Sequence, residues 1–172
     1  MQRVDLSIVI PALDEEKSIS ELHLLITKSL DKKNINYEVI FVDDGSTDST
    51  WNEIEKIINY NKKVKGIKFK KNYGKSDALD AAFKNSSGDF ILTMDADLQD
   101  DPYEIYKLLE IIKNKKFDLV SGWKKKRNDP LGKTIPSKFF NYVTRVFSGI
   151  HLNDFNCGIK IYRREVIESI DL

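Results

Sequence analysis

The sequence predicts an α/β fold with a mostly parallel central sheet flanked by helices. Apolar, β-branched runs of strand length alternate along the chain with longer segments of helical periodicity. The alternation continues from a first strand to a fifth, which is the order of strands and crossover helices in parallel sheets. Ligands of such sheets collect beyond the carboxyl ends of the strands, so a functional site is expected at that edge.

Each element is predicted from its own local pattern. The five predicted strands are the apolar runs at residues 6–13, 37–44, 64–71, 89–94 and 117–123. The helices predicted between them cover residues from about 15 to 30, 46–60, 75–88 and 102–113. We expect the second helix to be capped by Ser46, Thr47 or Asp48, the third to end at Gly88, and the fourth to be opened by Pro102.

The pattern changes after Trp123. The segment KKKRNDPLGK is basic and aperiodic, which predicts a long loop. An amphipathic helix is predicted at residues 137–150, with an apolar side made of Phe139, Phe140, Val143 and Phe147. Another helix is expected to begin in RREVIESIDL, close to the end of the sequence. We therefore expect residues 1–172 to form a single domain that is truncated at its C-terminal end.

Composition and charge exclude several classes of protein. The 28 basic and 27 acidic residues leave a formal net charge of +1, so the chain lacks the overall charge of a nucleic-acid-binding protein. The single cysteine, Cys157, excludes an internal disulfide, fits a reducing cytoplasmic compartment, and is predicted to be a small buried residue. His23 and His151 lack the spacing of metal ligands. No apolar run approaches the roughly 18 residues of a membrane-spanning helix.

Acidic residues follow two of the predicted strands. Asp43 and Asp44 end VIFVDD, and Asp95 and Asp97 follow the strand in ILTMDAD. Carboxylates brought together at one sheet edge repel one another unless a positive charge lies among them. Asp95, Asp97 and the amide oxygen of Gln99 are the hard oxygen ligands that Mg²⁺ or Mn²⁺ prefers. Such an ion would also attract a diphosphate, which bare carboxylates would repel.

Other acidic residues have structural interpretations, and other classes of site would leave different motifs. Asp48, Asp100 and Asp101 lie at predicted helix starts and are expected to be caps or solvated residues. Neither a phosphate-binding Walker motif nor a G-x-G-x-x-G fingerprint is present. A receiver-like acidic metal-binding module is a non-enzymatic alternative, because VDDG resembles its acidic pocket. In a receiver, however, the acidic pair follows the first strand, whereas here it follows the second.

Six motifs in order resemble family 2 glycosyltransferases, in particular those that transfer mannose or glucose to dolichyl or polyprenyl phosphate. They cover nearly the whole chain and are SIVIPALDEE, YEVIFVDDGSTDST, NYGKSDAL, GDFILTMDADLQDDP, DLVSGWKKKRNDP and LNDFNCGIKIYRREV. The resemblance implies a GT-A fold, a nucleotide-sugar donor and a divalent metal. It also implies transfer with inversion at the anomeric carbon.

The same resemblance assigns roles by position. Donor-nucleotide contacts are expected at Pro11, Ala12, Leu13, Glu15, Asp43, Asp44 and Lys75. Ribose, diphosphate and metal are expected at Asp95, Ala96 and Asp97, with Gln99 completing the metal ligands. These residues fix neither the base nor the sugar, so UDP-linked and GDP-linked donors both stay open.

This chain departs from the family pattern at two positions. Asp14 stands where the family commonly has Asn, and Lys124 stands where a closely similar motif has Arg. Lysine lacks the planar fork of arginine, so a bidentate grip on phosphate is not expected at position 124.

The acceptor determines which further residues are needed. Asp154 matches the position at which the family places a catalytic carboxylate, which would act as a base if the acceptor were a hydroxyl. A lipid phosphate arrives already ionised, so Asp154 would then orient groups while the basic residues from Lys124 to Arg127 attract the phosphate.

A polyprenyl or dolichyl phosphate at a membrane surface is the leading hypothesis for the acceptor. The alternative enzyme acts on a glycan hydroxyl in the synthesis of a cell-surface polysaccharide. Relatives often continue into membrane helices, so the resemblance also implies a longer protein anchored by a part absent here. Its catalytic domain is expected to face the cytoplasmic side of the membrane.

Overall fold

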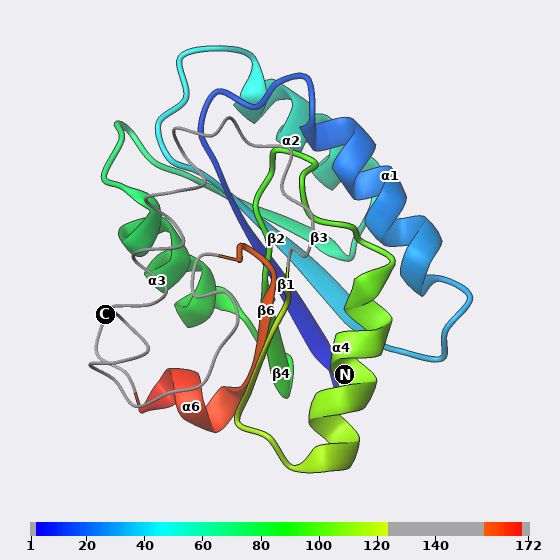
Figure 1. Cartoon of the computed structure of the whole chain (residues 1–172). Coiled ribbons are helices and arrows are strands. Elements are labelled where there is room, and N and C mark those ends of the chain that lie inside the picture. Colours follow the sequence, from blue (N-terminus) through cyan, green and yellow to red (C-terminus); the bar gives the residue numbers. More distant parts are fainter. Residues whose placement is uncertain (1–2, 124–156, 170–172) are drawn as a thin grey trace, which may run out of the picture.

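The computed structural model describes residues 3–123 and 157–169 as one six-stranded sheet with helices on both faces (Figure 1). The strands are β1 (Leu6–Ala12), β2 (Tyr37–Asp43), β3 (Val64–Lys68), β4 (Phe90–Thr93), β5 (Leu119–Ser121) and β6 (Lys160–Arg163). The helices are α1 (Ile19–Leu30), α2 (Thr50–Tyr60), α3 (Lys75–Asn85), α4 (Glu104–Lys115) and α6 (Arg164–Glu168). Helices α1, α2 and α4 cover one face of the sheet, and α3 and α6 lie on the other (Figure 1).

The sheet order is β3-β2-β1-β4-β6-β5. Strand β1 pairs in parallel with β2 and β4, and β2 pairs in parallel with β3. Strand β6 runs antiparallel to both of its neighbours, β4 and β5. The prediction of a mostly parallel sheet is therefore confirmed, while β6 is a strand that the sequence pattern did not predict.

All five predicted strands and the four helices predicted between them are present, with shifted ends, and the helix expected to begin in RREVIESIDL is α6. Helix α3 ends at Asn85 rather than at Gly88. A Cβ atom at Gly88 would lie 2.5 Å from the backbone nitrogen of Ser7, so this glycine allows close contact with β1 instead of ending the helix. The N-cap of α2 is Ser49, so the prediction of Ser46, Thr47 or Asp48 is wrong, although Asp48 Oδ1 accepts the N–H of Thr50 at the start of the helix.

The loop predicted after Trp123 and the helix predicted at residues 137–150 lie outside the described residues. Within the described part of the chain, no helix is both long enough and apolar enough to cross a membrane.

The core consists of two layers, one on each face of the sheet. Leu6, Ile8 and Ile10 of β1 pack toward α1, α2 and α4, while Val9 belongs to the cluster under α3. This alternation arises because successive side chains of a strand point to opposite faces. Both faces are covered by helices, so nearly the whole of β1 is apolar and buried. The rigid strands fix the positions of the loops at their ends.

A buried carboxylate joins the strands at their amino ends, opposite the expected site. Glu38 of β2 accepts hydrogen bonds from Ser7 Oγ of β1, at 2.7 Å, and from the backbone and hydroxyl of Ser87 before β4. Lys65 of β3 lies 2.7 Å from its other oxygen. Burial raises the pKa of the Glu38 carboxyl, but the bonds to Lys65, Ser7 and Ser87 outweigh it and hold the pKa below its ordinary value of 4.5.

We expect Glu38→Gln to lower the free energy of unfolding by about 1–3 kcal/mol at neutral pH, because it removes the charge that these donors compensate. The folded-state pKa is depressed, so this stabilisation is complete above the unfolded-state pKa. It is lost as the pH falls through the folded-state pKa. Urea unfolding across the acid range should therefore show the two stabilities converging below pH 4.5.

The matched control is Glu55→Gln, which changes an exposed glutamate of α2 and should alter stability little at any pH. A Glu38→Gln deficit that stays constant down to the acid limit of folding would contradict this account.

Candidate active site

The carboxyl ends of β1, β2 and β4 meet at one edge of the sheet, because β1 pairs in parallel with both neighbours. Ala12 is opposite Asp43, and Val9 is opposite Thr93. A cavity of about 280 Å³ lies at this edge. All of the predicted donor contacts except Asp43 line the cavity, together with Asn72 and Gly74, which were not among the predicted contacts.

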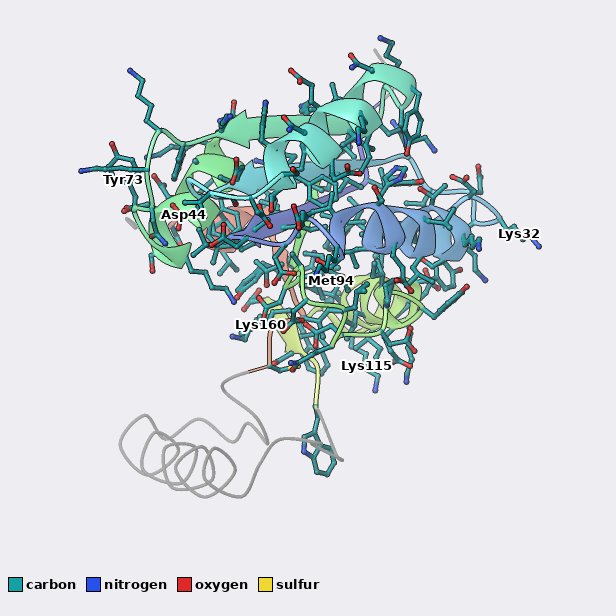
Figure 2. The ribbon with its side chains drawn as sticks, turned by 90° about the horizontal axis from the view of Figure 1, so that it is seen from above. Lys32, Asp44, Tyr73, Met94, Lys115 and Lys160 are labelled. Carbon is teal, nitrogen blue, oxygen red and sulfur yellow. The ribbon has the colours of Figure 1, made fainter. Side chains whose placement is uncertain are left out.

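Asp43 and Asp44 are engaged with backbone groups of the surrounding loops. Asp43 is fully buried, and its Oδ1 accepts the N–H of Ser46 at 2.9 Å. Asp44 accepts the N–H of Tyr73 on Oδ1 at 2.8 Å and the N–H of Gly74 on Oδ2 at 2.9 Å. Figure 2 shows Asp44 and Tyr73 together at one end of the site, with Met94 farther along the edge. Asp44 thus fixes the loop that leads into α3.

This loop lies against the turn after β2. A Cβ atom at Gly45 would lie 2.2 Å from the carbonyl carbon of Lys71, and Gly45 has a φ of 74°. Both the space and the backbone conformation require glycine there. The close contact brings Lys75, the first residue of α3, to the rim of the cavity.

The loops after β1 and β2 are also bonded to each other. Asp14 has a φ of 54°, and its Oδ1 accepts the N–H of Thr47 at 2.8 Å. Glu16 Oε2 accepts the N–H of Ser49 at 3.0 Å. Aspartate at the position where the family commonly has Asn keeps both the acceptor oxygen and the tolerance of the left-handed conformation. The loop carrying Leu13 and Glu15 is therefore held in place from both sides.

Asp95 and Asp97 follow β4 and face the cavity. Lys75 Nζ lies 2.5 Å from Asp95 Oδ1. Asp97 Oδ1 accepts the N–H of Gln99 at 3.0 Å, and Leu98 between them has a φ of 61°. This tight turn directs Gln99 to a neighbouring cavity of about 380 Å³, so Gln99 does not line the first one.

Asp100 differs from the prediction. It was expected to be a cap or a solvated residue, but it is only 4% exposed, so this prediction is wrong. A Cβ atom at Gly158 would lie 2.5 Å from Asp95 Oδ2 and 2.6 Å from Asp100 Oδ2, so the two carboxylates share the space that this glycine leaves. The prediction for Asp101 is confirmed, because Asp101 is exposed to solvent; its Oδ1 accepts the N–H of Tyr103, the N-cap residue of α4.

The donor atoms around Asp95 and Asp97 suit a hard divalent cation. They are carboxylate oxygens, and the ammonium group of Lys75 shows that Asp95 already attracts positive charge. Within residues 3–123 and 157–169, no three His, Cys, Asp or Glu side chains gather as a metal site. A cation on these two aspartates would therefore need further oxygen ligands, from an amide group of the protein, from its substrate or from solvent. Asp154, Lys124 and Arg127 lie outside the described residues.

Comparison with known proteins gives one family. The model of glycosyl transferase family 2 matches residues 7–171. Dodecaprenyl-phosphate galacturonate synthase of Rhizobium johnstonii is 33% identical over 174 residues, which cover 100% of this chain and 52% of that protein. Undecaprenyl-phosphate 4-deoxy-4-formamido-L-arabinose transferase of Shewanella sediminis is 36% identical over 171 residues, which cover 98% of this chain and 51% of that protein. The chain thus spans about half the length of these curated relatives.

Solved structures show the same fold. The mannosyltransferase PcManGT from Pyrobaculum calidifontis, in complex with GDP-Man and Mn²⁺, matches with a TM-score of 0.72 and 21% identity, over 98% of this chain and 47% of that one. Glucosyl-3-phosphoglycerate synthase from Mycobacterium tuberculosis, in complex with Mn²⁺, UDP and phosphoglyceric acid, matches with a TM-score of 0.78 and 20% identity. The match covers 97% of this chain and 58% of that one. The predicted GT-A fold is confirmed.

The receiver-like alternative is wrong. Receivers have a strand order of 2-1-3-4-5. Here β1 lies between β2 and β4, and an antiparallel strand follows β4 in the sheet. The family match over residues 7–171 points the same way.

The structure predicts that the main role of the Asp44 carboxylate is to hold the loop before α3 in place. Asp44→Asn replaces one acceptor oxygen by a donor, which would face a backbone N–H. We expect a loss of about 1–3 kcal/mol in the free energy of unfolding. Hydrogen exchange of the Tyr73 and Gly74 amides should also become faster.

Asp118→Asn changes an exposed aspartate that does not line the cavity and serves as the control. Unchanged protection of both amides in Asp44→Asn would show that the carboxylate does not hold this loop.

Proposed function

The chain belongs to glycosyl transferase family 2, and we propose that the protein transfers a sugar from a nucleotide sugar to a polyprenyl phosphate, with inversion at the anomeric carbon. The observation that carries the proposal is the match of nearly the whole chain to curated transferases named for dodecaprenyl and undecaprenyl phosphate. The cavity supports it, because it combines carboxylates, a lysine and backbone groups at the carboxyl edge of a parallel sheet.

The donor is proposed to bind in this cavity. We assign the nucleoside to the part of the cavity lined by residues 11–13, Glu15 and Asp44, and the ribose and diphosphate to the part lined by Asp95, Ala96 and Asp97. Asp95 and Asp97 would hold Mg²⁺ or Mn²⁺, with Gln99 as a further candidate ligand. When bound, that ion offsets the negative charge that grows on the departing diphosphate. Relatives solved with GDP-Man and Mn²⁺, or with UDP and Mn²⁺, support this assignment.

The acceptor chemistry requires no strong base. A phosphate oxygen of the lipid attacks the anomeric carbon as the bond from that carbon to the diphosphate oxygen breaks, so no proton has to be removed. The residues from Lys124 to Arg127 are proposed to attract the lipid phosphate, and Asp154 to orient the reacting groups. Because a polyprenyl phosphate is a membrane lipid, we place the reaction at the cytoplasmic face of a membrane.

Donor binding can be tested by calorimetric titration with UDP, GDP, UDP-glucose and GDP-mannose, each with Mn²⁺ and with a chelator. One nucleotide class is expected to bind in a metal-dependent way. Asp97→Ala should weaken that binding by about a hundredfold or more, because it removes a metal ligand.

Asp80→Ala removes an aspartate that pairs with Lys84 on α3 and should leave nucleotide binding unchanged. Binding that is indifferent to the chelator and to Asp97→Ala would refute a metal held at this pair of aspartates.

The acceptor can be tested with the donor identified in that titration, using undecaprenyl phosphate, undecaprenol and an oligosaccharide in parallel. Mass spectrometry is expected to detect a sugar–phosphate–lipid product only with undecaprenyl phosphate. Transfer to the oligosaccharide without any transfer to the lipid phosphate would instead establish an enzyme that acts on a glycan hydroxyl.

A further inference from the structure

Lys75 lies across the cavity from the strand that supplies Asp95. It is the first residue of α3, whereas Asp95 follows β4, and the two side chains meet with Nζ 2.5 Å from Oδ1. The Lys75 side chain is 57% exposed and that of Asp95 is 32% exposed, so solvent and ligands can reach this ion pair. Exposed pairs of this kind are weak, typically below about 1 kcal/mol, and can be exchanged for a better partner.

The two oxygens of Asp95 have different surroundings. Oδ2 lies beside Gly158, next to Asp100 Oδ2, on the side where β6 begins. Oδ1 is the oxygen that Lys75 binds, and both residues line the donor cavity. A divalent cation that approaches Asp95 from the cavity therefore meets the Lys75 ammonium group on that oxygen. Two positive charges within a few ångströms repel each other, so they cannot share the oxygen favourably.

The backbone at Lys75 is fixed, but its side chain can move. Asp44 holds the N–H groups of Tyr73 and Gly74, which anchors the start of α3. The four-carbon stem of lysine carries a point charge with rotatable donors, so the ammonium can change partners without any movement of the helix. A diphosphate bound in the same cavity offers it such a partner.

We propose that Lys75 is an internal counter-ion of Asp95, which the divalent cation displaces and which then binds the diphosphate of the donor. The inference rests on the proposed function, because it takes a metal and a nucleotide donor as the ligands of this cavity. Before the metal and the donor bind, the Lys75 ammonium balances the negative charge of Asp95. After they bind, it balances the negative charge of the donor diphosphate. Metal binding alone must break the ion pair, whereas metal and donor together give Lys75 a new partner.

Titration with Mn²⁺ alone distinguishes this role from simpler ones. If Lys75 only anchors the diphosphate, its removal leaves Mn²⁺ binding unchanged. If it only holds Asp95 in position, its removal weakens Mn²⁺ binding. If it competes with the metal, its removal strengthens Mn²⁺ binding and weakens nucleotide binding.

The experiment follows the electron paramagnetic resonance signal of free Mn²⁺ during titration of the purified chain without nucleotide. We expect Lys75→Met to bind Mn²⁺ about three- to tenfold more tightly than the wild type, because the ion pair and the repulsion are both removed. With Mn²⁺ saturating, the same variant should bind UDP or GDP about tenfold more weakly. Lys75→Arg keeps the positive charge and should retain the weak Mn²⁺ binding of the wild type.

The matched control is Lys84→Met. Lys84 pairs with Asp80 at 2.7 Å on the same helix and is 71% exposed, away from the cavity. This variant should leave both affinities unchanged. Thermal unfolding of every variant establishes that the fold is intact.

Mn²⁺ binding by Lys75→Met that is equal to the wild type, weaker or undetectable would overturn the counter-ion role. Failure of the proposed function gives a different result, in which wild-type protein binds Mn²⁺ but neither nucleoside diphosphate. Even in that case, comparing the Mn²⁺ affinities of the wild type and Lys75→Met shows whether Lys75 competes with the metal for Asp95.

Discussion

Negative charge gathered at the carboxyl edge of the sheet has to be compensated, and the loops at this edge are arranged around that requirement. Asp44 is compensated by two backbone N–H groups and Asp95 by the Lys75 ammonium, whereas Asp43 accepts one N–H on Oδ1 and its buried Oδ2 has no hydrogen bond within the described residues. Parallel pairing of β1 with β2 and β4 makes the requirement unavoidable, because it brings these strand ends together. The same carboxylates that hold the loops thereby shape the cavity.

This arrangement separates a rigid part of the site from an exchangeable one. The loops after β1 and β2 are bonded to each other through Asp14 and Glu16, and the loop before α3 is bonded to Asp44. Such groups are preorganised, so a ligand does not have to order them when it binds. The Lys75–Asp95 pair is the part in which charge can be redistributed. The end of the cavity formed by the loops after β1 and β2 is thus rigid, and the end at the Lys75–Asp95 pair is adaptable.

The sequence predicted the parts of this structure that depend on local pattern. Buried strands such as β1 and β2 have continuous apolar runs, and the acids that end them are visible without any coordinates. Strand β6 was missed because KIYR is short, mixes charge with apolar residues and pairs antiparallel with residues far away in the chain. The burial of Asp100 was missed for a related reason. It depends on Gly158, and no local pattern connects these two positions.

The antiparallel direction of β6 also bears on how this fold can diversify. A Cβ atom at Gly122, just after β5, would lie 2.9 Å from Cys157 Sγ. The end of one described range, at residue 123, and the start of the next, at residue 157, are therefore close together. The pairing of Ser121 with Lys160 fixes both ends. Each doubling of the length of a connection closed in this way costs only about 0.6 kcal/mol in flexible chains. Segments of different lengths can therefore be exchanged between these two points at a small cost in free energy, without moving the carboxyl edge of the sheet.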